Sequence, residues 1–65
     1  MGKAADPVEP MLYRVEEAAE ALRLSRSALY ELIRSGQLRT VKCGRRRLVP
    51  VAALVEYVAI LERPA

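Results

Sequence analysis

The hydrophobic positions of residues 15–36 recur at the three- and four-residue intervals of two short amphipathic helices. These positions are Val15, Ala18, Ala19, Leu22, Leu24, Leu29 and Leu32. The dipeptide Arg23-Leu24 separates the two segments, so the pattern predicts helices that pack across a tight turn, with Leu24 in the corner. The residues left on the outer face of the turn and second segment are Ser25, Arg26, Ser27, Tyr30 and Arg34.

Local signals set the ends of these helices. The first is predicted over Val15–Leu22, with two glutamates in its first turn where the helix dipole favours negative charge. Arg14 is a poor N-cap residue, so either the boundary lies a residue or two away or another group supplies the cap. Ser25 is a good N-cap for the second helix, and Gly36 suits the left-handed position after its end.

After Gly36 the hydrophobic period changes from that of a helix to that of a strand. Residues 37–43 and 46–49 read as two strands around Gly44-Arg45, with glycine in the first central position of a type II′ turn. This segment therefore predicts a β-hairpin with a basic tip.

The hairpin register follows from the two-residue turn. It places Val41 opposite Leu48, which we expect on the core face, and Lys42 opposite Arg47 on the other face. Two facing cations weaken an isolated hairpin, but they suit a surface that lies against a phosphate backbone.

A third helix is predicted over Val51–Glu62, between Pro50 and the pair Arg63-Pro64. We expect its core stripe to be Val51, Leu54, Val55, Val58 and Leu61. Ala53, Tyr57 and Ile60 lie nearly opposite that stripe, so the helix is apolar on most of its circumference. A surface helix of this kind predicts a second apolar face that contacts another protein.

The chain is 65 residues long and has room for one domain. Residues 1–10 are polar and contain two prolines, and they are predicted to be a disordered tail. Residues 11–65 form the predicted domain, with residues 11–14 as a short extended lead-in.

Charge is concentrated in the middle of the chain. The net charge is +3, but residues 21–50 contain eight basic residues and a single acid, Glu31. Nine of the 11 basic residues are arginines, whose forked guanidinium groups suit phosphates and guanine edges. This distribution predicts a polyanion-binding surface.

Other chemistry is poorly represented. The chain has no histidine and one cysteine, Cys43, so an intramolecular disulfide is excluded and a zinc or redox site lacks companion ligands. We expect no cofactor, no metal and no enzymatic activity. The amino terminus has no signal-peptide pattern and no segment reaches the length of a membrane span, so we expect a cytoplasmic protein without a membrane partner.

Four motifs together carry a family resemblance. They are Val15-Glu16-Glu17-Ala18-Ala19, Leu24-Ser25-Arg26-Ser27 running into Ala28-Leu29-Tyr30, Ile33-Arg34-Ser35-Gly36 before Gln37-Leu38, and Gly44-Arg45-Arg46-Arg47. Over residues 12–61 the chain resembles the excisionase-type branch of the MerR-like winged helix-turn-helix proteins. The resemblance implies a mainly α fold with a small β-hairpin: three helices plus a two-stranded wing.

The resemblance also implies how the protein works: the second helix enters the major groove of double-stranded DNA and the wing reaches the minor groove or backbone. The predicted DNA-binding residues are Ser25, Arg26, Ser27, Tyr30, Arg34, Arg39, Lys42, Arg45, Arg46 and Arg47. Arg23 departs from the family pattern, because glycine is common in that turn. A positive φ at Arg23 would cost roughly 1 kcal/mol.

We expect an excisionase, a recombination directionality factor that directs an integrase towards excision and binds neighbouring DNA sites cooperatively. Ala53, Tyr57 and Ile60 would then contact the integrase or a second protomer; the alternative is that the helix is tucked under the ordered tail or packed loosely. A MerR regulator would continue into a dimerising helix and an effector-binding region; because this sequence ends at Ala65, we expect no sensing of a metal or drug. A small effector-free transcription regulator remains an alternative, as does a protein-interaction module.

Overall fold

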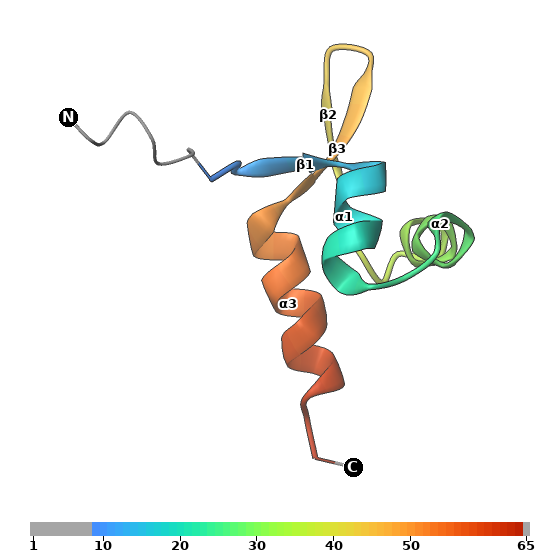
Figure 1. The fold of residues 1–65 in the computed structure, drawn as a ribbon, viewed down its shortest axis with the longest axis vertical. Coiled ribbons are helices and arrows are strands. Elements are labelled where there is room, and N and C mark those ends of the chain that lie inside the picture. Colours follow the sequence, from blue (N-terminus) through green and yellow to red (C-terminus); the bar gives the residue numbers. More distant parts are fainter. Residues whose placement is uncertain (1–8, 65) are drawn as a thin grey trace, which may run out of the picture.

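A three-stranded antiparallel sheet connects the beginning of the domain to its last helix (Figure 1). The computed structural model describes residues 9–64, so most of the predicted tail lies outside the described residues. The elements are β1 (Leu12–Arg14), α1 (Val15–Leu22), α2 (Arg26–Arg34), β2 (Val41–Cys43), β3 (Arg46–Pro50) and α3 (Val51–Leu61). The β2–β3 hairpin projects from one end of the molecule, and α3 extends towards the other (Figure 1).

Strand β1 corrects the prediction of a two-stranded wing. It pairs with β3 and places Tyr13 opposite Val49, so the strand order is β1-β3-β2. The backbone N–H of Val51 also donates a hydrogen bond of 3.0 Å to the carbonyl of Met11. The lead-in becomes a strand because it pairs with backbone groups that the hairpin alone leaves at the open edge of β3.

The predicted register of the hairpin is confirmed. Val41 pairs with Leu48 and Lys42 pairs with Arg47. Gly44 has φ +65°, as the first central residue of the predicted turn requires.

The predicted core face of the hairpin is wrong. Val49 is fully buried, whereas Val41 is 37% exposed and Leu48 is only partly buried. Successive strand residues point to opposite faces, so the helices cover the face that carries Val49 and not the face that carries Leu48. Arg47, two residues before Val49, therefore shares the face on which the helices lie.

Helix α1 has the predicted bounds, and Glu17 supplies the cap that Arg14 cannot. The Oε1 atom of Glu17 accepts a 2.9 Å hydrogen bond from the Arg14 backbone N–H, and its Oε2 accepts a 3.0 Å bond from Arg14 Nη2. At the other end Arg23 adopts the left-handed conformation, with φ 61°. The turn thus requires a positive φ at Arg23, the case for which strain is expected from the sequence.

Helix α2 begins and ends as predicted. The Ser25 hydroxyl oxygen accepts a 3.1 Å hydrogen bond from the Ala28 N–H. After the helix, Gly36 has φ +83°, its N–H donates to the carbonyl of Ile33, and the N–H of Gln37 donates to the carbonyl of Leu32. This pair of bonds is the Schellman arrangement that ends a helix at glycine.

The core lies where α1, α2 and α3 meet the sheet. Its buried members are Val15, Ala18, Ala19, Leu29, Leu38, Val49, Ala53 and Leu54. Tyr13, Leu22, Leu24, Leu32, Ile33 and Tyr57 pack against it and are partly buried. The core is small and aliphatic, and it fixes α2 and the hairpin relative to each other.

Of the predicted core stripe of α3, Leu54 is buried and Val51 is partly buried, but the rest of the predicted orientation is wrong. Ala53 is 2% exposed and Tyr57 packs against the core, although both were expected on the free face, whereas Val55 and Leu61 are 62% and 64% exposed. Because α3 is apolar nearly all round, its periodicity does not select a face. The small side chain of Ala53 lets the helix backbone approach the core closely.

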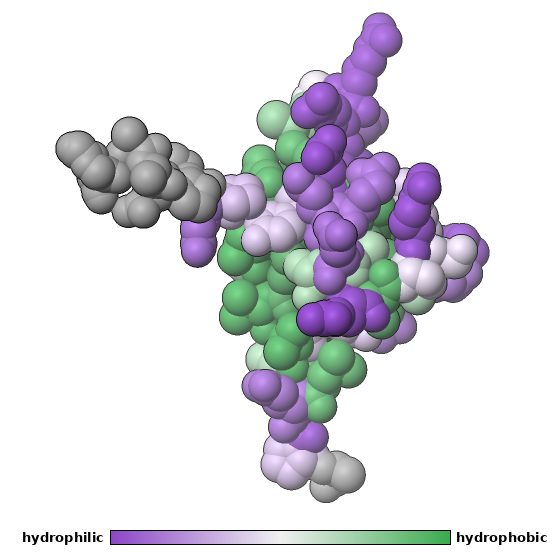
Figure 2. All heavy atoms as spheres, viewed as in Figure 1, coloured by the Kyte–Doolittle hydropathy of each residue, from purple (hydrophilic) through white to green (hydrophobic). Residues whose placement is uncertain are grey.

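A hydrophobic surface consequently lies over the outer side of α3 (Figure 2). Its exposed members are Val55, Val58, Ile60 and Leu61, and the first two also line a groove with Leu22 of α1. Ile60 is the residue of the predicted interaction face that stays half-exposed. Among residues 9–64, no helix combines the length and hydrophobicity that crossing a bilayer requires.

Candidate nucleic-acid interface

The described structure brings the outer face of α2 against the base of the β2–β3 hairpin. Tyr30 of α2 and Arg47 of β3 line two neighbouring open hollows. The first hollow is also lined by Arg14, Val15, Glu16, Arg46 and Leu48, and the second by Ile33 and Arg34. We call the residues Tyr30, Arg34, Arg46 and Arg47 the junction surface.

All ten residues that were predicted to bind DNA are exposed. Four of them form the junction surface. Arg26 and Ser27 lie in the first turn of α2, where Ser25 fixes the backbone by capping. Arg45 lies in the turn of the hairpin, and Lys42 lies on β2 opposite Arg47.

The position of Arg47 depends on the face that the hairpin presents. Because Arg47 shares a face with Val49, it emerges beside α2, and its Nη1 atom donates a 3.4 Å hydrogen bond to Thr40 Oγ1. Lys42 is its cross-strand neighbour. The hairpin therefore adds positive charge directly next to the exposed face of α2.

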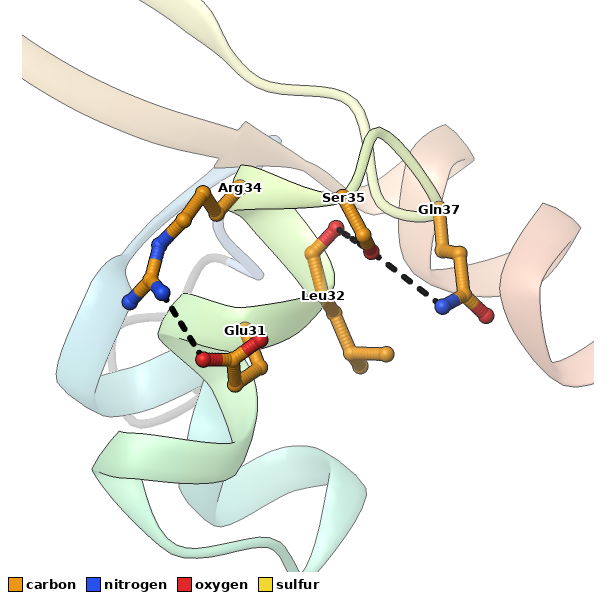
Figure 3. A network of polar contacts seen from close by, with 5 residues as sticks. All are labelled: Glu31, Leu32, Arg34, Ser35 and Gln37. Atoms are coloured by element: carbon orange, nitrogen blue, oxygen red, sulfur yellow. Dashed lines mark hydrogen bonds and ion pairs between the residues drawn. The ribbon is translucent and has the colours of Figure 1, made fainter.

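The last turn of α2 carries a short polar network (Figure 3). Arg34 Nη1 donates a 2.9 Å hydrogen bond to Glu31 Oε2. Ser35 Oγ donates to the Leu32 carbonyl at 3.3 Å, and Gln37 Nε2 donates to Ser35 Oγ at 3.1 Å. Glu31 was not predicted as a site residue, although a pair of opposite charges three positions apart on a helix is the signal for such a contact.

Arg39 has a different partner from the other predicted site residues. Its Nε and Nη2 atoms donate to the two carboxylate oxygens of Glu56 on α3, at 3.1 and 3.0 Å. The hydrogen bond from Arg39 lowers the pKa of Glu56, and the same bond raises the pKa of Arg39. Within the described residues, Arg39 lines neither hollow of the junction surface and instead ties the segment before β2 to α3.

Arg14 is a candidate site residue that the sequence did not single out. It lines the first hollow together with Arg46 and Arg47. Its guanidinium is held by Glu17, and this hydrogen bond lowers the pKa of Glu17. The pairing of β1 with β3, which sets Arg14 opposite Leu48, brings this arginine to the hairpin.

Other site chemistry is sparse in the described part of the chain. Cys43 is exposed on β2. Residues 9–64 contain no group of three or more histidine, cysteine, aspartate or glutamate side chains positioned to hold a metal ion. The junction surface, with its arginines and one tyrosine, is suited to binding an extended anion.

Comparison with known proteins gives the class. Residues 12–59 match the family model described as "Helix-turn-helix domain", so the chain belongs to the helix-turn-helix domain family. Proteins of this class use their second helix to contact DNA, and the family assignment supports DNA binding.

A curated relative gives a more particular similarity. The chain is 43% identical over 51 residues to a protein of Saccharopolyspora erythraea described as "Probable excisionase". The match covers 78% of this chain and 52% of that protein, so the chain spans about half the length of this relative. No solved structure gives a significant match.

Proposed function

We propose that this protein binds double-stranded DNA sequence-specifically and acts as an excisionase, directing integrase-mediated recombination towards excision. The observation that carries the DNA-binding part is the convergence of Tyr30 and Arg47, which joins the outer face of α2 to the basic hairpin. The similarity to a probable excisionase supports the recombination part. The strand-paired hairpin supports a winged, MerR-like arrangement.

In the proposed complex, α2 enters the major groove and the hairpin lies along the adjacent backbone or minor groove. Arg26, Ser27 and Tyr30 would then face base edges and phosphates, since the first turns of a recognition helix approach the bases. Arg45, Arg46 and Arg47 would neutralise phosphates or enter the minor groove. Arg14 would extend this cationic edge at the start of α1.

Arg39 takes a secondary place in this proposal. Its bidentate bonds to Glu56 occupy the guanidinium, so we propose that it positions α3 and contributes to DNA binding only through its charge. Lys42 would contribute to the phosphate contacts of the hairpin. Ser25 would act first as the cap of α2, with its hydroxyl hydrogen available to a phosphate.

The exposed α3 surface is the part of the molecule that we assign to a protein partner. Val55 and Val58 line a groove against α1, on elements separate from α2 and the hairpin. A protein bound there would leave the junction surface open to DNA. The proposed partner is the integrase or a second protomer on a neighbouring DNA site.

A binding experiment tests the first part of the proposal. Gel shifts with random duplex and single-stranded DNA, at two salt concentrations, should show duplex binding that weakens steeply as salt increases. A folded sample with no salt-sensitive affinity for any duplex would contradict the proposal and favour a protein-interaction module.

A recombination experiment tests the second part. Adding the protein to an integrase and attachment-site DNA from the same element should increase excision and reduce integration. Footprinting on that DNA should place protected sites beside the attachment site. Binding at a promoter with no effect on excision would favour the alternative, a small transcription regulator.

A further inference from the structure

Glu31 is an acid at the centre of a cationic stretch. Residues 21–50 contain eight basic residues, and Glu31 is the one acid among them. It is exposed on α2, next to Tyr30 and one turn before Arg34. A carboxylate here repels phosphates and weakens binding to every duplex alike. Affinity for DNA therefore gives no reason for an acid at this position.

Helix stability gives only a weak reason for an acid at position 31. Glu31 Oε2 and Arg34 Nη1 are 2.9 Å apart, but the two side chains are 65% and 72% exposed (Figure 3). Exposed ion pairs of this kind contribute little to stability, because water and salt screen them. The more distinctive consequence is geometric: the contact places the Arg34 guanidinium directly beside a carboxylate.

The pair offers a defined set of hydrogen-bonding groups. Arg34 keeps N–H donors on its other nitrogens, since Nη1 makes the bond to Glu31. Glu31 Oε1 has no hydrogen-bond partner among residues 9–64. In the major groove, a C·G pair presents the N4 donor of cytosine beside the O6 and N7 acceptors of guanine. One free acceptor next to a fork of donors is complementary to that edge.

We propose that Glu31 is a specificity-determining residue: it orients Arg34, and the two side chains together recognise a C·G base pair. The inference rests on the proposed function, because it requires α2 to lie in the major groove. The Glu31 carboxylate repels phosphates and so lowers the affinity of the protein for all DNA. This loss is offset only at sites where cytosine N4 donates a hydrogen bond to the carboxylate. Glu31 thus increases the difference in affinity between the preferred site and other sequences.

The experiment compares base preference in wild type and variants. A duplex library with a randomised segment is selected on the wild-type protein, and the affinities for one selected duplex and one mixed-sequence duplex are measured. Glu31→Gln should bind the mixed-sequence duplex more tightly and lose roughly five- to 100-fold of the preference for the selected one. The selection is then repeated with Glu31→Gln and with Arg34→Gln. In both cases the preference for C·G should disappear at the same position of the selected sequences.

Glu20→Gln is the matched control, because it removes an equal charge from an exposed position on α1. It should raise the affinity for both duplexes by the same factor and leave the selected sequence unchanged. If Glu31→Gln behaves like Glu20→Gln, while circular dichroism shows both variants folded, the inference is wrong and the proposed function stands. If the wild type binds no duplex, the proposed function itself fails.

Discussion

Tyr30 of α2 and Arg47 of β3 line the same two hollows, although they belong to different elements. Their proximity depends on the buried Val49, which fixes the face of β3 that turns towards the helices. It also depends on the Schellman ending of α2 at Gly36, which turns the chain away from the helix. The basic hairpin and the outer face of α2 are thereby combined into one surface.

Replacing Arg45, Arg46 and Arg47 together with glutamine should strongly reduce duplex binding. The salt dependence of the binding constant should also become shallower, by about 0.9 in the log–log slope for each phosphate that the variant no longer neutralises. Arg63→Gln, which removes one exposed charge after α3, should leave that slope nearly unchanged. Titrations at several salt concentrations measure both slopes, and equal slopes for the triple variant and wild type would contradict the assignment of the hairpin.

Replacing Arg23 with glycine should stabilise the protein. Arg23 has φ 61°, a conformation that costs a residue with a Cβ about 1 kcal/mol and costs glycine very little. The greater freedom of glycine in the unfolded chain offsets part of the gain, so we expect the free energy of unfolding to rise by less than about 1 kcal/mol. Urea denaturation measures this, and a marked loss of stability would show that the Arg23 side chain makes a stronger contribution than its backbone strain.

The Arg39–Glu56 pair should make stability depend on pH. The hydrogen bond from Arg39 lowers the pKa of Glu56 in the folded state, so the pair stabilises the protein at neutral pH. This contribution is complete above the ordinary pKa of glutamate and disappears as the pH falls through the lowered value. Thermal unfolding of wild type and Glu56→Gln should therefore differ at pH 7 and converge in strong acid. Arg39→Gln should reproduce the convergence.

The two faces of the hairpin should respond differently to truncation. Val49→Ala removes a fully buried side chain and should cost about 1–3 kcal/mol of unfolding free energy, because it leaves a cavity. Val41→Ala removes a side chain that is 37% exposed, so its cost should be clearly smaller. Denaturant unfolding of the two variants compares these costs directly. A greater cost at Val41 would mean that the Leu48 face is the packed one.

Changing Val55 and Val58 to serine tests the exposed α3 surface. Both side chains line the groove beside α1, away from the junction surface, so affinity for a single DNA site should be unchanged. Cooperative binding to adjacent sites, or stimulation of excision by an integrase, should disappear because the variant no longer offers an apolar surface. Gel shifts with one-site and two-site duplexes distinguish these effects. Full activity of the double variant in both assays would remove α3 from the proposed mechanism.

The local features were predictable because neighbouring residues determine them. The caps of α2 at Ser25 and Gly36 follow from hydroxyl chemistry and from the conformational freedom of glycine. The hairpin register follows from a two-residue turn at Gly44-Arg45, and it holds in the structure. The pairing of β1 with β3 was not predictable in the same way, because a three-residue strand has too few positions to show a period.

The sequence predicted most residues of the candidate site, but not how they are arranged or which residues they contact. Its exposed arginines could be read from the sequence, and each of the ten predicted residues is indeed at the surface. The contacts of these arginines could not be read from the sequence. Glu56 contacts Arg39 from a different helix, and Arg14 lies beside the hairpin only because β1 pairs with β3. The Glu31–Arg34 contact was the exception, since both residues lie on one helix.

By itself, the sequence determined the two helices of the turn, the caps of the second helix, the hairpin register and the concentration of positive charge in residues 21–50. Only the tertiary structure decided which face of β3 and which face of α3 became buried. The physical reason is that both faces of β3 and nearly the whole circumference of α3 offer apolar side chains, so periodicity leaves the choice open. Packing settles it: Val49 and Ala53 are the residues that fit against the helices and sheet, and their burial directs Arg47 to α2 and leaves Val55 exposed.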